Sequence, residues 1–325
     1  MMKLNSKKNV DPWIHMPEDI RKGLNSNQKT IPSKYFYDQR GSQLFDQICE
    51  LPEYYQTRTE KSLLHEHSPA IVRWTRAREI FELGSGTAMK TQVLIESFLN
   101  ENSTMTYKPL DISISALQEA KSRLQSYSGL CIEPLVGDYT QNLSCISPDE
   151  SCLVLFLGST IGNLLPNQAH SMIASISSRL NPGDWFLLGV DLIKDPEIIE
   201  AAYNDSRGIT AQFNKNILNV VNSYLDGNFQ TKDFSHYAYF NRDKNQIEMH
   251  LTANKNVSVY LKKIDLNVHI RKGESILTEI SRKFSRQSVK IMLEESNFRL
   301  NHWLANGNGC FALALAKAEP RSSPL

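Results

Sequence analysis

A glycine turn after an apolar segment is the first feature of this sequence that could do chemistry. The segment FELGSGTAMK, residues 81–90, passes through Gly84 and Gly86 and then enters a helical pattern. Because glycine has no Cβ, such a turn lets the backbone approach a bound cofactor closely. Met89 stands where GxGxxG would have its third glycine, and the GxxxxGK[ST] pattern of P-loops is absent. The turn therefore predicts a cofactor without a pyrophosphate group.

Two acidic residues follow the turn in the order that an adenosine site requires. Asp111 ends the next predicted strand, 25 positions after Gly86, where a carboxylate can accept hydrogen bonds from both ribose hydroxyls. Asp138 follows the third predicted strand and can accept from an adenine amino group, while Tyr139 can pack on the ring. Each residue alone is more often a turn or cap residue. Together, in chain order, they predict a pocket for S-adenosylmethionine.

The elements that must position these residues alternate between strands and helices. Apolar runs predict strands over residues 78–83, 106–111, 131–139, 151–159 and 185–191. Helical patterns lie between them, over residues 90–99, over 115–126 with Ser115 and Gln118 as a capping box, and after Pro166. This alternation predicts an α/β fold with a mostly parallel, doubly wound sheet.

The pattern changes after Asp195. A helix is predicted over residues 197–225, and the alternating segments HYAYF, QIEMHLTA and SVYLKKIDLNVHI predict an antiparallel insertion. A last helix over residues 288–295 and strands near FRLNHWL and GCFALALA are expected to return to the first sheet. We therefore expect a cofactor-binding domain made of residues 61–195 and 287–325, and a substrate-binding domain made of residues 1–60 and 196–286.

Composition excludes several kinds of partner. The 325 residues are 41% hydrophobic and 22% charged, with a formal net charge of +1, which gives no electrostatic reason to expect nucleic acid or an anionic membrane as partner. The five cysteines lack CxxC spacing, so neither a metal site nor a disulfide framework is predicted. A polar N-terminus and the lack of a long apolar run predict a cytoplasmic protein. We expect a monomer that acts on a small molecule.

Long segments of the chain carry a more specific signal. They are PSKYFYDQRGSQLFDQICELPEYYQTRTE, ELGSGTAMKT, FLGSTIGNLLP, GVDLIKDPEIIEAAYND, IEMHL and LTEISRKF. Through them, from about Pro32 to Leu315, the chain resembles the S-adenosylmethionine-dependent L-histidine Nα-methyltransferases of ergothioneine biosynthesis. The resemblance implies a class I methyltransferase core with a second, substrate-binding domain. One departure is Ser159, where GGTIGN is common in the family.

The resemblance also implies an activity and its site residues. The activity is methylation of the α-amino group of L-histidine, up to the trimethyl betaine hercynine. By similarity, the cofactor site contains Gly84, Lys90, Asp111, Asp138 and Tyr139, to which the glycine turn adds Gly86. The substrate site contains Tyr37, Tyr54, Gly158, Asn163, Tyr203, Met249, Glu279 and Ser281.

The resemblance also implies roles for these substrate residues, and their chemistry suits those roles. Glu279 and Ser281 alternate along a predicted strand, so they face the same side and can both reach an imidazole ring. Met249 would pack against the ring, and Tyr203, placed on a predicted helix, would bind the carboxylate. The α-amine must lose a proton before methyl transfer. The candidates for accommodating or relaying this proton are Tyr37 and a water molecule held by Asn163. We therefore take Tyr37 and Asn163 as the catalytic residues.

Two alternatives remain open from the sequence. One is the same reaction on another aromatic amino acid such as tryptophan, although an indole would favour a smaller, uncharged wall than Glu279 and Met249 provide. The other is a cofactor-binding sensor without turnover, because a Rossmann-like fold alone does not imply catalysis. Substrate competition and product analysis separate these alternatives.

Overall fold

The computed structural model describes residues 13–141 and 143–320. Its helices are α1 (Met16–Leu24), α2 (Gln39–Cys49), α3 (Tyr55–Thr75), α4 (Gln92–Glu101), α5 (Ile114–Leu124), α6 (Pro166–Ser177), α7 (Pro196–Ala201), α8 (Ile209–Leu225) and α9 (Arg286–Glu294). Its strands are β1 (Lys29–Thr30), β2 (Glu79–Leu83), β3 (Met105–Asp111), β4 (Leu130–Ile132), β5 (Leu135–Val136), β6 (Cys152–Phe156), β7 (Trp185–Asp191), β8 (Phe234–Asn241), β9 (Gln246–Ala253), β10 (Val257–Leu261), β11 (Leu266–Ile270), β12 (Ser275–Arg282), β13 (Phe298–Ala305) and β14 (Phe311–Ala318).

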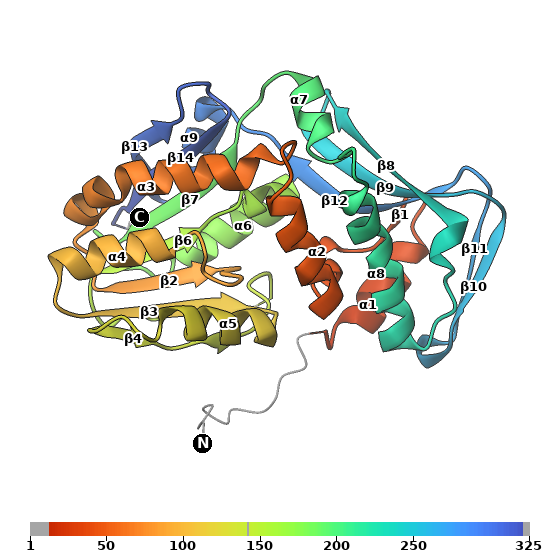
Figure 1. The fold of residues 1–325 in the computed structure, drawn as a ribbon, viewed down its shortest axis with the longest axis horizontal. Helices are drawn as coiled ribbons and strands as arrows, with labels where there is room; N and C mark the ends of the chain where they lie inside the picture. Colours follow the sequence, from red (N-terminus) through yellow and green to blue (C-terminus); the bar gives the residue numbers. More distant parts are fainter. Residues whose placement is uncertain (1–12, 142, 321–325) are drawn as a thin grey trace, which may run out of the picture.

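The large sheet has the strand order β13-β14-β7-β6-β2-β3-β4, and β5 also pairs with β3 (Figure 1). The strands from β7 to β4 and β5 run parallel, whereas β14 lies antiparallel to both β7 and β13. The C-terminal segment therefore returns to the sheet, as expected from the sequence. This topology confirms the predicted α/β fold and its class I methyltransferase core.

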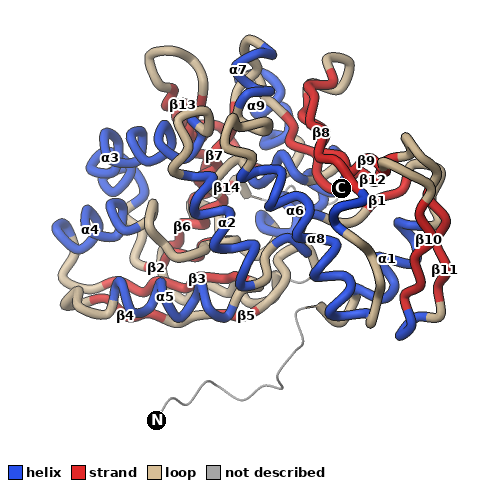
Figure 2. The backbone as a smooth tube through the Cα atoms, turned by 45° about the vertical axis from the view of Figure 1, so that its right-hand side comes forward, coloured by secondary structure: helices blue, strands red, loops and turns tan. Residues whose placement is uncertain are grey.

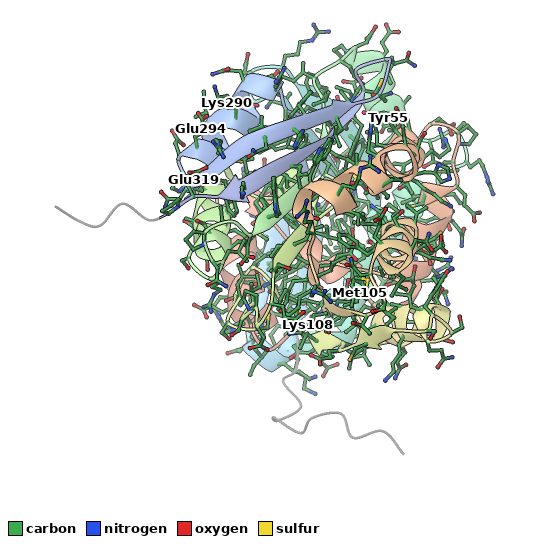
Figure 3. All side chains as sticks on the ribbon, turned by 90° about the vertical axis from the view of Figure 1, so that its left-hand side faces the viewer. Tyr55, Met105, Lys108, Lys290, Glu294 and Glu319 are labelled. Atoms are coloured by element: carbon green, nitrogen blue, oxygen red, sulfur yellow. The ribbon has the colours of Figure 1, made fainter. Side chains whose placement is uncertain are left out.

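Two apolar layers cover the two faces of the large sheet. On β6, Leu153 and Leu155 pack into the layer formed with α3, α4 and α5, while Val154 and Phe156 pack into the layer formed with α6 and α9. The continuous apolar run of this strand thus reflects burial on both sides, as expected for a parallel strand. Figure 3 draws the side chains and labels Lys290 and Glu294, which form an exposed pair on α9.

The second sheet has the order β1-β12-β9-β8, with β8, β9 and β12 antiparallel and the short β1 parallel to β12. It shares one apolar core with α1, α2 and α8, and α2 packs against α8 (Figure 2). Strands β10 and β11 form a separate antiparallel hairpin. The predicted antiparallel insertion is therefore confirmed, and the segment before α3 joins it. Helix α3 crosses residue 60, so the domain boundary itself remains a prediction.

Two predicted elements are interrupted in the structure. The strand expected over residues 131–139 is two short strands, β4 and β5, separated by Glu133 and Pro134. Proline has no N–H to donate to a ladder. The helix expected over residues 197–225 is α7 and α8, separated by a turn in which Gly208 has a φ of +68°. The carboxylate of Asp205 accepts hydrogen bonds from the backbone N–H groups of the first turn of α8.

The start of α5 also differs from the expected capping box. The N-cap is Ser113, whose hydroxyl accepts from the N–H of Ala116 at 3.3 Å, and not Ser115. The cause is the end of β3, where the Asp111 carboxylate accepts from the N–H of Ser113 at 2.8 Å and so sets the start of the helix.

No helix within the described ranges combines the length and apolar character that crossing a bilayer requires. The polar N-terminus, on which the predicted cytoplasmic location partly rests, lies among residues 1–12 and so outside the described residues.

Candidate functional site

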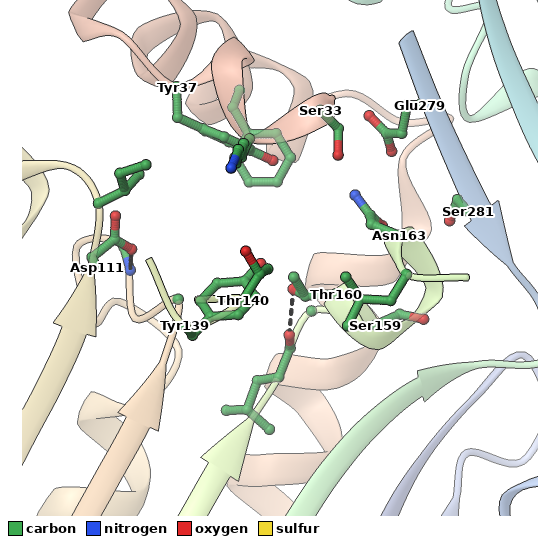
Figure 4. A pocket seen from close by; sticks show the side chains of 18 of the residues that line it. Ser33, Tyr37, Asp111, Tyr139, Thr140, Ser159, Thr160, Asn163, Glu279 and Ser281 are labelled. Atoms are coloured by element: carbon green, nitrogen blue, oxygen red, sulfur yellow. Dashed lines mark hydrogen bonds between the residues drawn. The ribbon is translucent and has the colours of Figure 1, made fainter. Parts of the chain in front are cut away.

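One cavity of about 1220 Å³ lies where the large sheet meets the second sheet, and every site residue predicted from the sequence lines it (Figure 4). The carboxyl ends of β2, β3, β5 and β6 open into it through Gly84, Asp111, Asp138 and Gly158. Ligands bind at this end of parallel sheets, where the crossover direction reverses. Opposite them, β9 and β12 supply the other wall.

The glycine turn follows β2 directly. Gly84 and Gly86 have φ values of +65° and +53°, a conformation that other residues adopt only with strain. A Cβ at position 86 would meet no protein atom within 4 Å, so the turn presents open backbone to the cavity. The Asp111 carboxylate accepts from the N–H of Gly86 at 2.8 Å. Burial raises the pKa of Asp111, while hydrogen bonds from Ser113 and Gly86 oppose that rise.

Asp111 therefore also stabilises the glycine turn, a role that the sequence did not predict. Each of its two oxygens already accepts one backbone N–H, yet a carboxylate oxygen has a second acceptor position. The residue can hold the turn and still accept ribose hydroxyls. The open turn and this carboxylate fit the adenosine part of S-adenosylmethionine.

Asp138 and Tyr139 lie on the next loop. Asp138 binds the ammonium of Lys34 at 3.1 Å and accepts from Thr140, and Lys34 also binds Asp19 at 3.0 Å. Lys34 thus ties the segment before α2 to the predicted adenine side of the cavity. The ring of Tyr139 stands edge-on to Phe156, with centroids 5.3 Å apart, and so presents a face for packing.

Lys90 is held by a residue that the sequence analysis missed. It lies in the turn before α4 and forms a salt bridge with Glu60, which is 0% exposed. The Glu60 carboxylate also accepts from the N–H of Gly158 at 2.7 and 3.0 Å. Burial lowers the pKa of Lys90, but the charge and hydrogen bond of Glu60, together with the nearby Cys49 and Glu82, outweigh it and raise the pKa above its ordinary value. Lys90 therefore stays charged beside the cofactor half of the cavity.

Glu279 and Met249 are cross-strand neighbours on β12 and β9, so their side chains lie close together. Figure 4 shows Glu279 and Asn163 on the same side of the cavity. Burial raises the pKa of Glu279 to about 7, although the charge of Lys283 and a hydrogen bond from Asn163 act in the opposite direction. Near neutral pH this carboxyl group can therefore exchange between its charged and neutral forms.

Ser281 lies two residues farther along β12 and lines the same cavity, in line with the predicted alternation. Its hydroxyl accepts from the hydroxyl of Tyr203 at 2.8 Å and from the ammonium of Lys283 at 2.9 Å. Tyr203 lies in the turn after α7, and not on a helix as predicted, because the chain turns there to place Asp205 at the start of α8. To bind a substrate carboxylate, the Tyr203 hydroxyl would have to stop donating to Ser281 and donate to that carboxylate instead.

Tyr37 and Tyr54 belong to an aromatic wall above this site. Tyr37 stands edge-on to Phe45 and Phe213, and Tyr54 edge-on to Tyr203. Burial raises the pKa of both phenols well above the ordinary value. They therefore stay neutral and can orient a substrate but do not act as anionic bases.

Ser159 stands where the family motif commonly has glycine, and its contacts show how serine is accommodated there. Its φ of +56° lies in the left-handed region, where glycine is the usual residue. The serine hydroxyl compensates by accepting from the N–H of Asp191 at 2.9 Å. Asn163 follows at the end of the short 3-10 helix Thr160–Asn163.

Three residues with close contacts to the site were absent from the sequence prediction: Glu60, Lys34 and Lys283. The alternation that pairs Glu279 with Ser281 extends by two positions to Lys283. Glu60 and Lys34 both lie in a segment that carries the family resemblance. The pairing of Lys34 with Asp138, 104 residues farther along the chain, had no local signal.

Replacing Gly86 by alanine is expected to weaken S-adenosylmethionine binding at least about tenfold, because the methyl group would enter the cradle, and to destabilise the protein by roughly 1–2 kcal/mol through left-handed strain. Calorimetric titration and thermal unfolding measure the two effects. Gly273→Ala is the matched control, because Gly273 has a φ of +85° and open space around it but does not line the cavity. Equal affinities in the two variants would contradict the placement of the cofactor.

Within residues 13–141 and 143–320, no group of three or more histidine, cysteine, aspartate or glutamate side chains is arranged to hold a metal ion.

Comparison with known proteins agrees with this geometry. The family model described as histidine-specific methyltransferase, SAM-dependent, matches residues 16–318. Histidine N-alpha-methyltransferase of Mycolicibacterium smegmatis is 40% identical over 92% of this chain and 93% of its own length, and that of Mycobacterium tuberculosis is 39% identical over 93% and 95%. Ergothioneine biosynthesis protein 1 of Schizosaccharomyces pombe is 30% identical over 88% of this chain but 38% of its own length. The chain therefore belongs to the family of S-adenosylmethionine-dependent, histidine-specific methyltransferases.

Proposed function

We propose that this protein transfers methyl groups from S-adenosylmethionine to the α-amino group of L-histidine, up to the trimethyl betaine hercynine, as the first step of ergothioneine biosynthesis. The observation that carries the proposal is the single cavity with two kinds of wall. Gly86 and Asp111 lie on one side, and the Glu279, Ser281 and Met249 side chains lie on the other. The family membership and the named relatives support the same reaction.

The cofactor half is assigned from groups that fit its parts. Asp111 would accept the ribose hydroxyls, Asp138 would accept from the adenine amino group, and Tyr139 would pack on the ring. Lys90 would hold the methionine carboxylate, with Glu60 keeping its ammonium in place. When bound, S-adenosylmethionine supplies a methyl group on a sulfonium centre that leaves readily.

The substrate half is assigned by polarity. The Glu279 carboxylate would accept the imidazole N–H and Ser281 would contact the other ring nitrogen, while Met249 lies beside Glu279 to pack on the ring. Asn163 offers a donor and an acceptor to the amino acid end, and the open backbone at Gly158 lets that end approach. An aromatic ring without nitrogen would leave Glu279 and Ser281 unpaired, which is a strong basis for selectivity.

The transfer needs a neutral amine aligned with the methyl group, so orientation and exclusion of water are the main contributions of the protein. Tyr37 stays a neutral phenol, since its pKa is raised by burial, and so would align the amine or pass on its proton. A water held by Asn163 is the second route for that proton. The predicted cytoplasmic location and monomeric state are part of this proposal.

The decisive experiment incubates the purified protein with labelled S-adenosylmethionine and the twenty amino acids, followed by mass spectrometry. We expect mass shifts of one, two and three methyl groups on histidine and on no other amino acid. Methylation of tryptophan or tyrosine in its place would refute the roles of Glu279 and Ser281. Cofactor binding without S-adenosylhomocysteine formation would favour a sensor.

A further inference from the structure

Lys283 lines the cavity beside Ser281 and Tyr203 and is almost fully buried, with its side chain 1% exposed. Its ammonium group lies 2.9 Å from the Ser281 hydroxyl, 3.2 Å from the Tyr203 hydroxyl and 2.9 Å from the Asp191 carboxylate. A lysine ammonium has three donors and no acceptor. All three donors are therefore in use, and Lys283 cannot turn toward another partner without leaving one of these groups.

These contacts determine what the Ser281 hydroxyl can do. Its oxygen accepts one hydrogen bond from Lys283 and a second from Tyr203 at 2.8 Å. A serine oxygen has two acceptor positions and carries one hydrogen. With both acceptor positions occupied, the only function left to Ser281 toward the cavity is to donate its O–H. A serine hydroxyl without these two donors could rotate and either donate or accept a hydrogen bond.

Glu279, two residues earlier on the same strand, has the opposite character in its ionised form, because a carboxylate only accepts. The cavity wall therefore offers an acceptor and a donor side by side. Aromatic rings differ in how well their hydrogen-bonding groups match this acceptor and this donor. Neutral imidazole has one N–H and one bare nitrogen, imidazolium has two N–H groups, and pyrrole has one N–H and no ring acceptor.

We propose that Lys283 is a positioning residue for substrate selection: by donating to both Ser281 and Tyr203 it makes Ser281 an obligate donor, so the pocket recognises a neutral ring with a bare nitrogen. This inference rests on the proposed histidine methylation, which assigns no role to Lys283. Lys283 acts through Ser281, its charge also favours the ionised form of Glu279, and it does not itself react. Removing the Lys283 ammonium should leave methyl transfer possible but weaken the discrimination between rings with and without a bare nitrogen.

A purely structural role for Lys283 would be to neutralise Asp191, which is fully buried. Lys194 provides the matched control for that role. Its ammonium also pairs with Asp191 and donates to the hydroxyl of Tyr55 at 2.7 Å, but no contact joins it to Ser281 or Tyr203 within the described residues. Asp191 keeps one cation and the Tyr55 hydroxyl in either variant, so both variants lose the same charge beside the same carboxylate.

The test measures kcat/KM for histidine and for 3-pyrrolylalanine, which has a ring N–H but no ring acceptor, in the wild type, Lys283→Met and Lys194→Met. We expect the wild type to prefer histidine by about 100-fold or more, since a site built to bind a polar group rejects a ligand without it. Lys283→Met should reduce this preference at least about tenfold, mainly through a higher KM for histidine, while Lys194→Met changes it less than about twofold. A preference unchanged in Lys283→Met, or lowered equally in both variants, overturns the inference.

A spectroscopic measurement on the wild type covers the case in which Lys283→Met does not fold. Nitrogen-15 resonances of ring-labelled histidine, bound together with S-adenosylhomocysteine, should show one protonated nitrogen and one bare, hydrogen-bonded nitrogen. Two protonated nitrogens, or a bare nitrogen without a hydrogen bond, overturn the role of Ser281 as donor. If the wild type neither binds nor methylates histidine, the proposed function falls as well, whereas normal turnover with the wrong ring state removes only this inference.

Discussion

Replacing Glu279 by alanine should lower kcat/KM for histidine at least about 100-fold, mainly through a higher KM, because the imidazole N–H would lose its acceptor inside a buried site. Selectivity against phenylalanine and tryptophan should fall in the same variant. Steady-state kinetics with each amino acid measure both effects. Unchanged histidine kinetics would remove Glu279 from the substrate site.

The pH profile separates the charge of Glu279 from its size. Because burial raises the pKa of Glu279 to about 7, kcat/KM for histidine in the wild type should fall below about pH 7 as the carboxylate becomes protonated. Glu279→Gln keeps the shape of the side chain but does not titrate, so this contribution should disappear, while the titrations of the substrate's own imidazole, at about pH 6.5, and of its amine at higher pH remain. A pH profile of Glu279→Gln identical to that of the wild type would assign the inflection to the substrate or to another group.

Glu279 also affects stability, with a definite sign. Its pKa in the folded protein lies above the ordinary value of 4.5, so the folded state holds the proton more tightly than the unfolded chain. The unfolding free energy should therefore fall as pH rises from about 4.5 to 7. Glu279→Gln does not titrate and so removes this contribution. The unfolding free energy of the variant minus that of the wild type should therefore increase as pH rises from about 4.5 to 7.

Replacing Glu60 by alanine should destabilise the protein by about 2–3 kcal/mol, because the change leaves a partly buried cation and a buried N–H without their partner. Lys90 would lose its salt bridge and Gly158 its hydrogen bond. The space beside Gly189 would also empty, since a Cβ there would lie only 2.0 Å from the Glu60 carboxylate. Urea and thermal unfolding measure the loss.

Two variants of the same helix make that experiment specific. Glu66→Ala removes a carboxylate whose side chain is 68% exposed on α3 and should change stability by less than about 0.5 kcal/mol. Glu60→Gln keeps an acceptor for Gly158 but loses the charge, so it should fold better than Glu60→Ala while still binding the cofactor less tightly through the displaced Lys90. A Glu60→Ala variant as stable as Glu66→Ala would show that this contact carries little energy.

Local sequence determined much of the parallel core. The apolar run of β6, the glycine turn and the acidic residue at the end of β3 are set by residues adjacent in the chain, because burial on both faces and positive φ angles each impose a local composition. The alternation of strands and helices then restricts the topology. The return of β14 to the sheet could also be anticipated, since a strand of apolar residues needs a sheet to cover it, but its antiparallel direction was not predicted.

Where strong local signals competed, the sequence predictions were less accurate. A proline divided the expected third strand, and Asp205 with Gly208 divided the expected helix over residues 197–225. Tyr203 was placed on a helix for this reason, although it lies in a turn. These errors concern places where one or two residues interrupt an otherwise continuous pattern, and the size of that effect depends on tertiary contacts.

The sequence by itself determined the identity of the groups at the site: a glycine turn, two acidic residues after strands, and a strand that alternates Glu279 with Ser281. The tertiary structure alone decided which of them meet. It paired Lys90 with Glu60 from 30 residues away and placed Lys283 beside Tyr203 from 80 residues away. The physical reason is that a buried charge is stable only with a partner, and the chain supplies that partner wherever the fold brings one within reach.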